Sequence, residues 1–109
     1  MITYKPTNAR YWCVVDLECT GLEPERHEII QIARVVIDTV EKTTIPGLTT
    51  SEYILPTRWD QRDHTAMKVN GLTSEKLQAE GISAKLALEE FGSGVNWSET
   101  VLAAWGVDF

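Results

Sequence analysis

The segment Asp16-Leu17-Glu18-Cys19-Thr20-Gly21-Leu22 places two carboxylates two residues apart, directly after an apolar run at residues 11–15. That run predicts a buried strand. Side chains two apart on a strand point to the same face, so Asp16 and Glu18 can converge at the strand's end. Converging carboxylates repel each other unless a cation lies between them, and hard oxygen ligands favour magnesium or manganese. The alternative is a solvated strand end that carries two exposed acids.

Two further segments bear on that choice. Residues 28–38, which begin Glu28-Ile29-Ile30-Gln31-Ile32-Ala33, are rich in β-branched side chains and predict a second strand. A short polar loop separates them from the first strand. Further along the chain comes Val69-Asn70-Gly71-Leu72-Thr73.

Taken in this order, the three segments resemble the opening of the DEDD-type 3′–5′ exonucleases, the DnaQ-like proofreading family of the ribonuclease H-like superfamily. The resemblance runs from about residue 12 to residue 73. It implies a hydrolase that cleaves phosphodiester bonds at the 3′ ends of single-stranded nucleic acid by two-metal-ion catalysis. RNA and DNA both fit this expectation.

The resemblance also implies roles for individual residues. Asp16 and Glu18 would be catalytic metal ligands for a pair of Mg²⁺ or Mn²⁺ ions, which clamp the attacking and leaving oxygens of an in-line displacement. The backbone at Thr20 and Gly21 would hold the terminal nucleotide, and Leu22 would pack on its base. For Leu22 the alternative is an ordinary core or loop leucine.

The later acidic motifs of the family are less complete here. Asp108 is the candidate metal ligand of the second motif, and its alternative is a frayed terminal acid. The third motif, an aspartate with a His or Tyr general base, would follow Phe109, while His27 and His64 lie upstream of where that base belongs. We therefore expect the N-terminal portion of an exonuclease domain, with little activity by itself. The alternative function is a catalytically inactive remnant that binds nucleic acid or a protein.

The remaining pattern predicts an α+β or mixed α/β fold. We expect a ribonuclease H-like sheet, truncated at the C-terminus, with helices packed on it. A polar lead-in at residues 1–10 precedes a three-strand antiparallel meander and a further strand. The strands are predicted at residues 11–17, 28–38, 52–55 and 100–105, with a loop at 39–50 and an irregular segment with a short helical turn at 59–68. Helices are predicted at 73–81 and 84–91, with Thr73 and Ser83 as their N-caps.

Composition sets the remaining expectations. A chain of 109 residues predicts a single, partial exonuclease domain. The net charge of −6 argues against a broad basic surface for nucleic acid, although carboxylates that hold metals contribute to that sum. The sequence has neither a run of 18 apolar residues nor a signal-peptide core, which predicts a cytoplasmic protein without membrane contact. A final strand would leave an exposed edge, so we expect a homo-oligomer or a partner chain that completes the fold.

Overall fold

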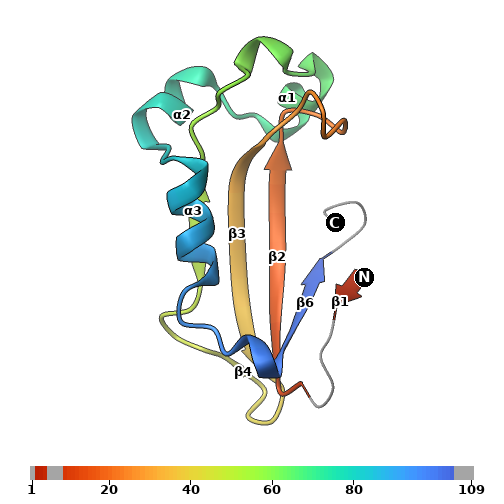
Figure 1. The fold of residues 1–109 in the computed structure, drawn as a ribbon, viewed down its shortest axis with the longest axis vertical. Coiled ribbons are helices and arrows are strands. Elements are labelled where there is room, and N and C mark those ends of the chain that lie inside the picture. Colours follow the sequence, from red (N-terminus) through yellow and green to blue (C-terminus); the bar gives the residue numbers. More distant parts are fainter. Residues whose placement is uncertain (1, 5–8, 105–109) are drawn as a thin grey trace. The chain divides into compact units, whose positions relative to one another are not determined.

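The computed structural model describes residues 2–4 and 9–104. Six strands within these residues form a mixed sheet, and Figure 1 labels β1, β2, β3, β4 and β6. The strand order is β1-β6-β2-β3-β4, and β5 pairs with β3 outside this path. The strands are β1 (Ile2–Tyr4), β2 (Tyr11–Cys19), β3 (Ile29–Asp38), β4 (Thr43–Thr44), β5 (Thr50–Tyr53) and β6 (Thr100–Ala104). The strands expected at 11–17 and 28–38 are confirmed, with shifts of one or two residues at their ends.

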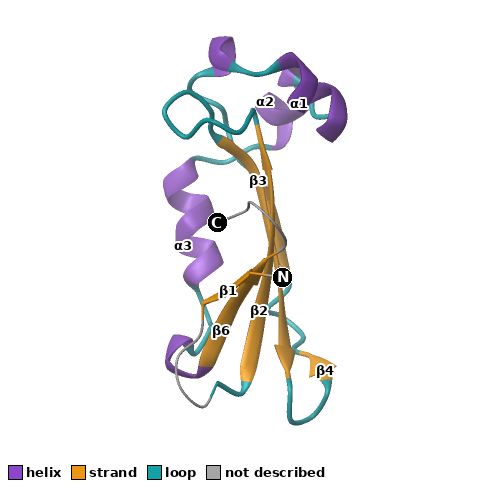
Figure 2. Ribbon diagram, turned by 90° about the vertical axis from the view of Figure 1, so that its right-hand side faces the viewer, coloured by secondary structure: helices purple, strands orange, loops and turns teal. Residues whose placement is uncertain are grey.

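Three α-helices and two 3₁₀ turns complete the described chain (Figure 2). They are α1 (His64–Asn70), α2 (Ser74–Glu80), α3 (Ala84–Gly92), η1 (Trp59–Gln61) and η2 (Trp97–Glu99). The expected helix starts are confirmed, because Thr73 Oγ1 accepts from Lys76 N–H and Ser83 Oγ accepts from Leu86 N–H. No helix among the described residues is long and apolar enough to cross a membrane.

Strand β6 corrects the expectation of an exposed final edge. It pairs in parallel with β2, in the register Tyr11↔Thr100, and antiparallel with β1, in the register Ile2↔Ala104. An inner strand has neighbours on both sides, so β6 offers no unpaired edge. Val101 is accordingly only 3% exposed. Trp105, which was expected to end this strand, lies outside the described residues.

Three local expectations were wrong or incomplete. The polar lead-in contains β1, which is too short to show periodicity and depends on its distant partner β6. The loop expected at 39–50 contains the two-residue β4, antiparallel to β3. The segment at 59–68 was expected to be irregular with a short helical turn. It contains η1 and also the start of α1 at His64, where the Asp63 carboxylate accepts from Ala66 N–H and caps the helix.

The described chain divides into two compact units. The first comprises Met1–Asp16, Ala33–Ser51 and Glu90–Phe109, and the second comprises Leu17–Ile32 and Glu52–Glu89. Small and branched apolar side chains form the core of each unit. In the first they are Cys13, Val15, Val36, Val101, Ala103 and Ala104, and in the second Ile30, Ile32, Ile54, Leu77 and Ala87.

A buried arginine organises the first unit. Arg34 on β3 is 3% exposed, and its guanidinium donates to three backbone carbonyl oxygens, those of Leu48, Phe91 and Ser93. It also lies over the Phe91 ring, with 5.9 Å from Cζ to the ring centroid. Arginine suits this position because its planar fork can satisfy several acceptors at once. The alternating burial of β3 therefore includes a cation at a position where an apolar residue would be usual.

At the end of β3, Asp38 joins the strand to the segment before β2. Arg10 donates to Asp38 through Nε and Nη2, at 3.0 and 2.8 Å, and the N–H groups of Val40 and Glu41 donate to the same carboxylate. The Arg10 hydrogen bonds, helped by these two backbone donors, lower the pKa of Asp38 from 3.8 to about 2.

This lowered pKa predicts an acid-dependent loss of stability. A carboxylate whose folded-state pKa lies below its unfolded value contributes stability that is complete above about pH 4 and is lost as the pH falls toward about 2. Asp38→Asn should therefore flatten the dependence of the unfolding free energy on pH between about 4 and 2. Urea unfolding across that range measures it, with Asp60→Asn, an exposed acid, as the control. An unchanged slope in Asp38→Asn would contradict the assignment.

Candidate active site

The two carboxylates of the opening segment lie on β2. Burial alternates along this strand, with Cys13 and Val15 buried and Asp16 exposed. Glu18 is half-buried two residues further on, so it shares the face of Asp16, opposite to Cys13 and Val15. The strand thus presents both acids on one face near its C-terminal end.

Thr20, directly after β2, is completely buried and closes the turn that follows. Its N–H donates to the Glu28 carbonyl at 2.9 Å, and its hydroxyl accepts from Glu28 N–H at 3.0 Å. Its carbonyl oxygen accepts from Asp63 N–H at 2.7 Å. The hydrogen-bonding groups of Thr20 are therefore engaged within the protein, and they hold the base of the loop formed by residues 21–27.

Glu28 connects this loop to the segment before α1. Its carboxylate accepts from Thr57 N–H, from the Thr57 hydroxyl and from Arg58 N–H, at 2.8, 3.1 and 2.7 Å. The Arg58 guanidinium donates in return to the carbonyl oxygens of Glu25 and His27. Hydrogen bonds to a charged carboxylate are among the stronger ones in proteins. Residues 57–58 and the loop at 21–27 are thus held together from both sides.

Asn70 links the third quoted segment to the first. Its Nδ2 donates to the Cys19 carbonyl at 3.2 Å, and its Oδ1 accepts from Leu72 N–H at 2.9 Å. Gly71 ends α1 with φ of 71°, a left-handed conformation that glycine adopts without strain. Gly71 thus turns the chain after α1, and Asn70 contacts the end of β2. These two roles give a physical reason for the Asn70-Gly71 pair in the third quoted segment.

The turn after Thr20 presents Leu22 to solvent, where its exposed fraction is 84%. Gly21 lies directly against the buried His27 ring, and a Cβ at Gly21 would be 2.3 Å from His27 Nδ1. The sequence singled out Gly21 and Leu22, but it gave His27 and Arg58 no role. Those two act through backbone partners, and no spacing rule signals such contacts.

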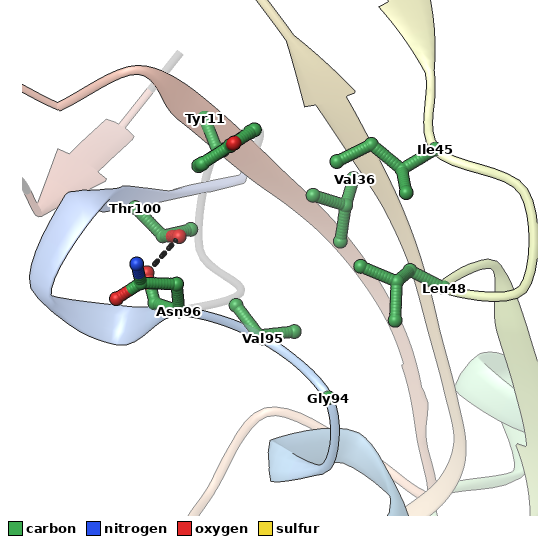
Figure 3. A pocket seen from close by; sticks show the side chains of 8 residues that line it. All are labelled: Tyr11, Val36, Ile45, Leu48, Gly94, Val95, Asn96 and Thr100. Carbon is green, nitrogen blue, oxygen red and sulfur yellow. Dashed lines mark hydrogen bonds between the residues drawn. The ribbon is translucent and has the colours of Figure 1, made fainter.

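Ligands beyond this pair are not evident in the described part of the chain. Residues 2–4 and 9–104 contain no cluster of three or more His, Cys, Asp or Glu side chains arranged to hold a metal ion. Asp108 lies outside the described residues. A cavity of about 150 Å³ in the first unit is lined mainly by apolar side chains, among them Val36, Ile45, Leu48 and Val95 (Figure 3). Asp16 and Glu18 do not line it.

Comparison with known protein families decides the assignment. The family model described as "Exonuclease" (RNase_T) matches residues 13–102, which include most of β2, the loop at 21–27 and all three helices. The chain belongs to the exonuclease family. The expected ribonuclease H-like fold is confirmed in this exonuclease domain. No match was found among curated protein sequences.

Several solved structures that share this fold are described as exonucleases. A product-bound exonuclease I superposes on 90% of this domain with a TM-score of 0.76 and 18% identity. A 3′-exonuclease described with a histone mRNA stem-loop covers 77% of it, with a TM-score of 0.61 and 24% identity. Exonuclease I of E. coli, in complex with a 5cy-dA13 oligonucleotide, covers 72% with a TM-score of 0.61 and 23% identity. The chain spans 22, 38 and 17% of these three proteins, respectively.

The contacts of Glu28 predict its importance for stability. Glu28→Gln replaces one carboxylate oxygen by an amide that cannot accept, so at least one N–H of residues 57–58 loses its charged acceptor. We expect a loss of about 1–3 kcal/mol in unfolding free energy. Chemical denaturation measures it, and Glu25→Gln, an exposed acid of the same loop, should change stability by less than about 0.5 kcal/mol. Equal stabilities of the two variants would contradict the role of Glu28.

Proposed function

We propose that this domain contributes the first two catalytic carboxylates of a 3′–5′ exonuclease acting on single-stranded nucleic acid. The observation that carries the proposal is the placement of Asp16 and Glu18 on one face of β2, within the segment matched by the exonuclease family. The reaction is hydrolysis of the phosphodiester bond at the 3′ end, which releases one nucleotide in each round. The chemistry of the donors and the family membership support the same conclusion.

The substrate is a 3′ end of single-stranded DNA or RNA. Structural relatives are described with a DNA oligonucleotide in one case and a histone mRNA stem-loop in another. In this domain the exposed Leu22 side chain is available to pack on the terminal base, and Gly21 allows the neighbouring backbone to lie against the His27 ring. Thr20 would contribute by fixing this turn from within.

The two carboxylates fit a hard divalent cation. Mg²⁺ is commonly held by one or two protein carboxylates, with water and substrate phosphates as the other ligands. Asp16 and Glu18 would hold Mg²⁺ or Mn²⁺ in this way. Such ions lower the pKa of bound water and stabilise charge on the leaving oxygen. The protein residues themselves would fix the position of the cation and, through Leu22, the position of the terminal nucleotide.

A second candidate function is a nucleic-acid-binding or protein-binding domain without catalysis. The absence of a three-ligand cluster from the described residues favours it. A partner chain or a second copy that supplies the remaining ligands would restore the first function. The two candidates differ in turnover, so shortening of a substrate that depends on Glu18 would favour the first.

The first test concerns the metal. In wild-type protein, adding Mn²⁺ should broaden the NMR signals of residues near Asp16 and Glu18, and Asp16→Ala should weaken binding at least about tenfold. Asp60→Ala removes an exposed acid on η1 and should leave the titration unchanged. Identical titrations of Asp16→Ala and wild type would exclude this pair as the cation site.

The second test concerns turnover. We expect the 109-residue chain to shorten a 5′-labelled single strand weakly or not at all in Mn²⁺, because its described residues bring together no cluster of three or more metal-ligating side chains. Any activity should disappear with EDTA and in Glu18→Ala. Stepwise shortening that depends on Glu18 would show that the site is completed in trans.

A further inference from the structure

The buried His27 makes a contact set that neither the family motif nor the proposed chemistry uses. The ring nitrogen Nδ1 of His27 accepts a hydrogen bond from the backbone N–H of Glu23 at 3.0 Å. The backbone N–H of His27 donates to the Glu23 carbonyl oxygen at 2.7 Å. Glu23 is therefore bonded to His27 through both of its backbone groups. The same carbonyl also accepts from Arg26 N–H at 3.0 Å, so residues 23–27 form a tight turn.

The ring of His27 also fixes Gly21 by shape. A Cβ built on Gly21 would be 2.3, 2.4 and 2.6 Å from three atoms of the imidazole, far inside van der Waals contact. Backbone and ring can approach this closely only because residue 21 is a glycine. Leu22 thus lies between one residue that packs on His27 and another that is hydrogen-bonded to it, while its own side chain is 84% exposed.

The other ring nitrogen of His27, Nε2, does not contribute, within the described part of the chain, a hydrogen bond that would hold the side chain in place. A nitrogen that accepts a hydrogen bond carries no proton, so the N–H of the neutral ring is at Nε2. Nε2 is buried and has no hydrogen-bond partner among the residues that the structure describes. A buried donor without a partner is unfavourable, so Nε2 does not explain the burial of this side chain. The Nδ1 hydrogen bond and the packing against Gly21 remain as its structural contributions.

We propose that His27 is a positioning residue for nucleic-acid binding, holding the Gly21–Glu23 turn so that Leu22 meets the terminal base of a single-stranded 3′ end. This inference rests on the proposed function, because Leu22 is assigned to the base there. A mobile turn would have to be ordered when the strand binds, which weakens affinity. His27 orders the turn beforehand, at a position that does not touch the substrate.

Affinity measurements on a short set of variants test whether His27 acts on nucleic-acid binding through Leu22. The probe is a labelled single-stranded oligonucleotide with a free 3′ hydroxyl, in Ca²⁺ to prevent turnover, followed by fluorescence anisotropy. Leu22→Ala should weaken binding roughly tenfold, as expected for about half of a leucine's burial. His27→Ala should have a similar effect, and His27→Ala in the Leu22→Ala background should add less than about twofold. Additive losses in the double variant would overturn the proposal.

Conservative and control variants separate positioning from folding. His27→Asn can place its Oδ1 near the position of Nδ1, so it should keep affinity within about threefold and keep the Glu23 amide protected from hydrogen exchange. His64→Ala removes an exposed histidine on α1 and should change neither property. Affinity as low in His27→Asn as in His27→Ala, with the Glu23 amide still protected, would overturn the proposal.

A measurement on the protein without nucleic acid distinguishes the positioning role of His27 from the proposed exonuclease function. If wild-type protein binds no oligonucleotide, the proposed function fails. Backbone ¹⁵N relaxation of Leu22 still reports on the turn, which should be rigid in wild type and in His27→Asn and mobile in Gly21→Ala, where the added Cβ displaces the ring. A Leu22 backbone equally rigid in wild type, Gly21→Ala and His27→Ala would show that His27 does not position the turn.

Discussion

The paired hydrogen bonds between Thr20 and Glu28 are the constraint on which the candidate site depends. They close the seven-residue loop at 21–27, while the Thr20 carbonyl and the Glu28 carboxylate extend the contact to Asp63 and to residues 57–58. The Thr20 carbonyl and the Glu28 carboxylate thereby fix segments that are far apart in the sequence. The loop that carries Leu22 is held at both ends, because the residues that flank it, Thr20 and Glu28, are hydrogen-bonded to each other.

The predictable parts of this domain are those that depend on neighbours in the chain. The periodicity of residues 11–19 and 29–38 revealed two strands, and Thr73 and Ser83 marked helix starts, because capping and alternation are local effects. β1 was not predicted, because three residues are too few to show the alternation of a strand and because β1 depends on pairing with the distant β6. Only a short helical turn was expected within residues 59–68, and the full length of α1 was not, because its cap, Asp63, lies in a segment rich in charged residues.

The candidate site divides in the same way. Asp16, Glu18, Gly21 and Leu22 could be named from spacing and resemblance, and the structure describes them all, whereas Asp108 lies outside its described residues. Arg58 and His27 could not be named, because they act on backbone atoms whose positions depend on the tertiary fold. Backbone N–H and carbonyl groups are present at nearly every residue. The sequence therefore does not indicate which of them a side chain such as His27 or Arg58 will contact.

Parallel pairing of β6 with β2 has a consequence for synthesis of the chain. About 80 residues separate the end of β2 from the start of β6, so β2 leaves the ribosome long before its neighbour exists. At roughly 5–20 residues per second this delay is on the order of ten seconds. During that time one side of β2 has backbone groups without strand partners, which makes the nascent chain a candidate client for chaperones that shield unpaired strands.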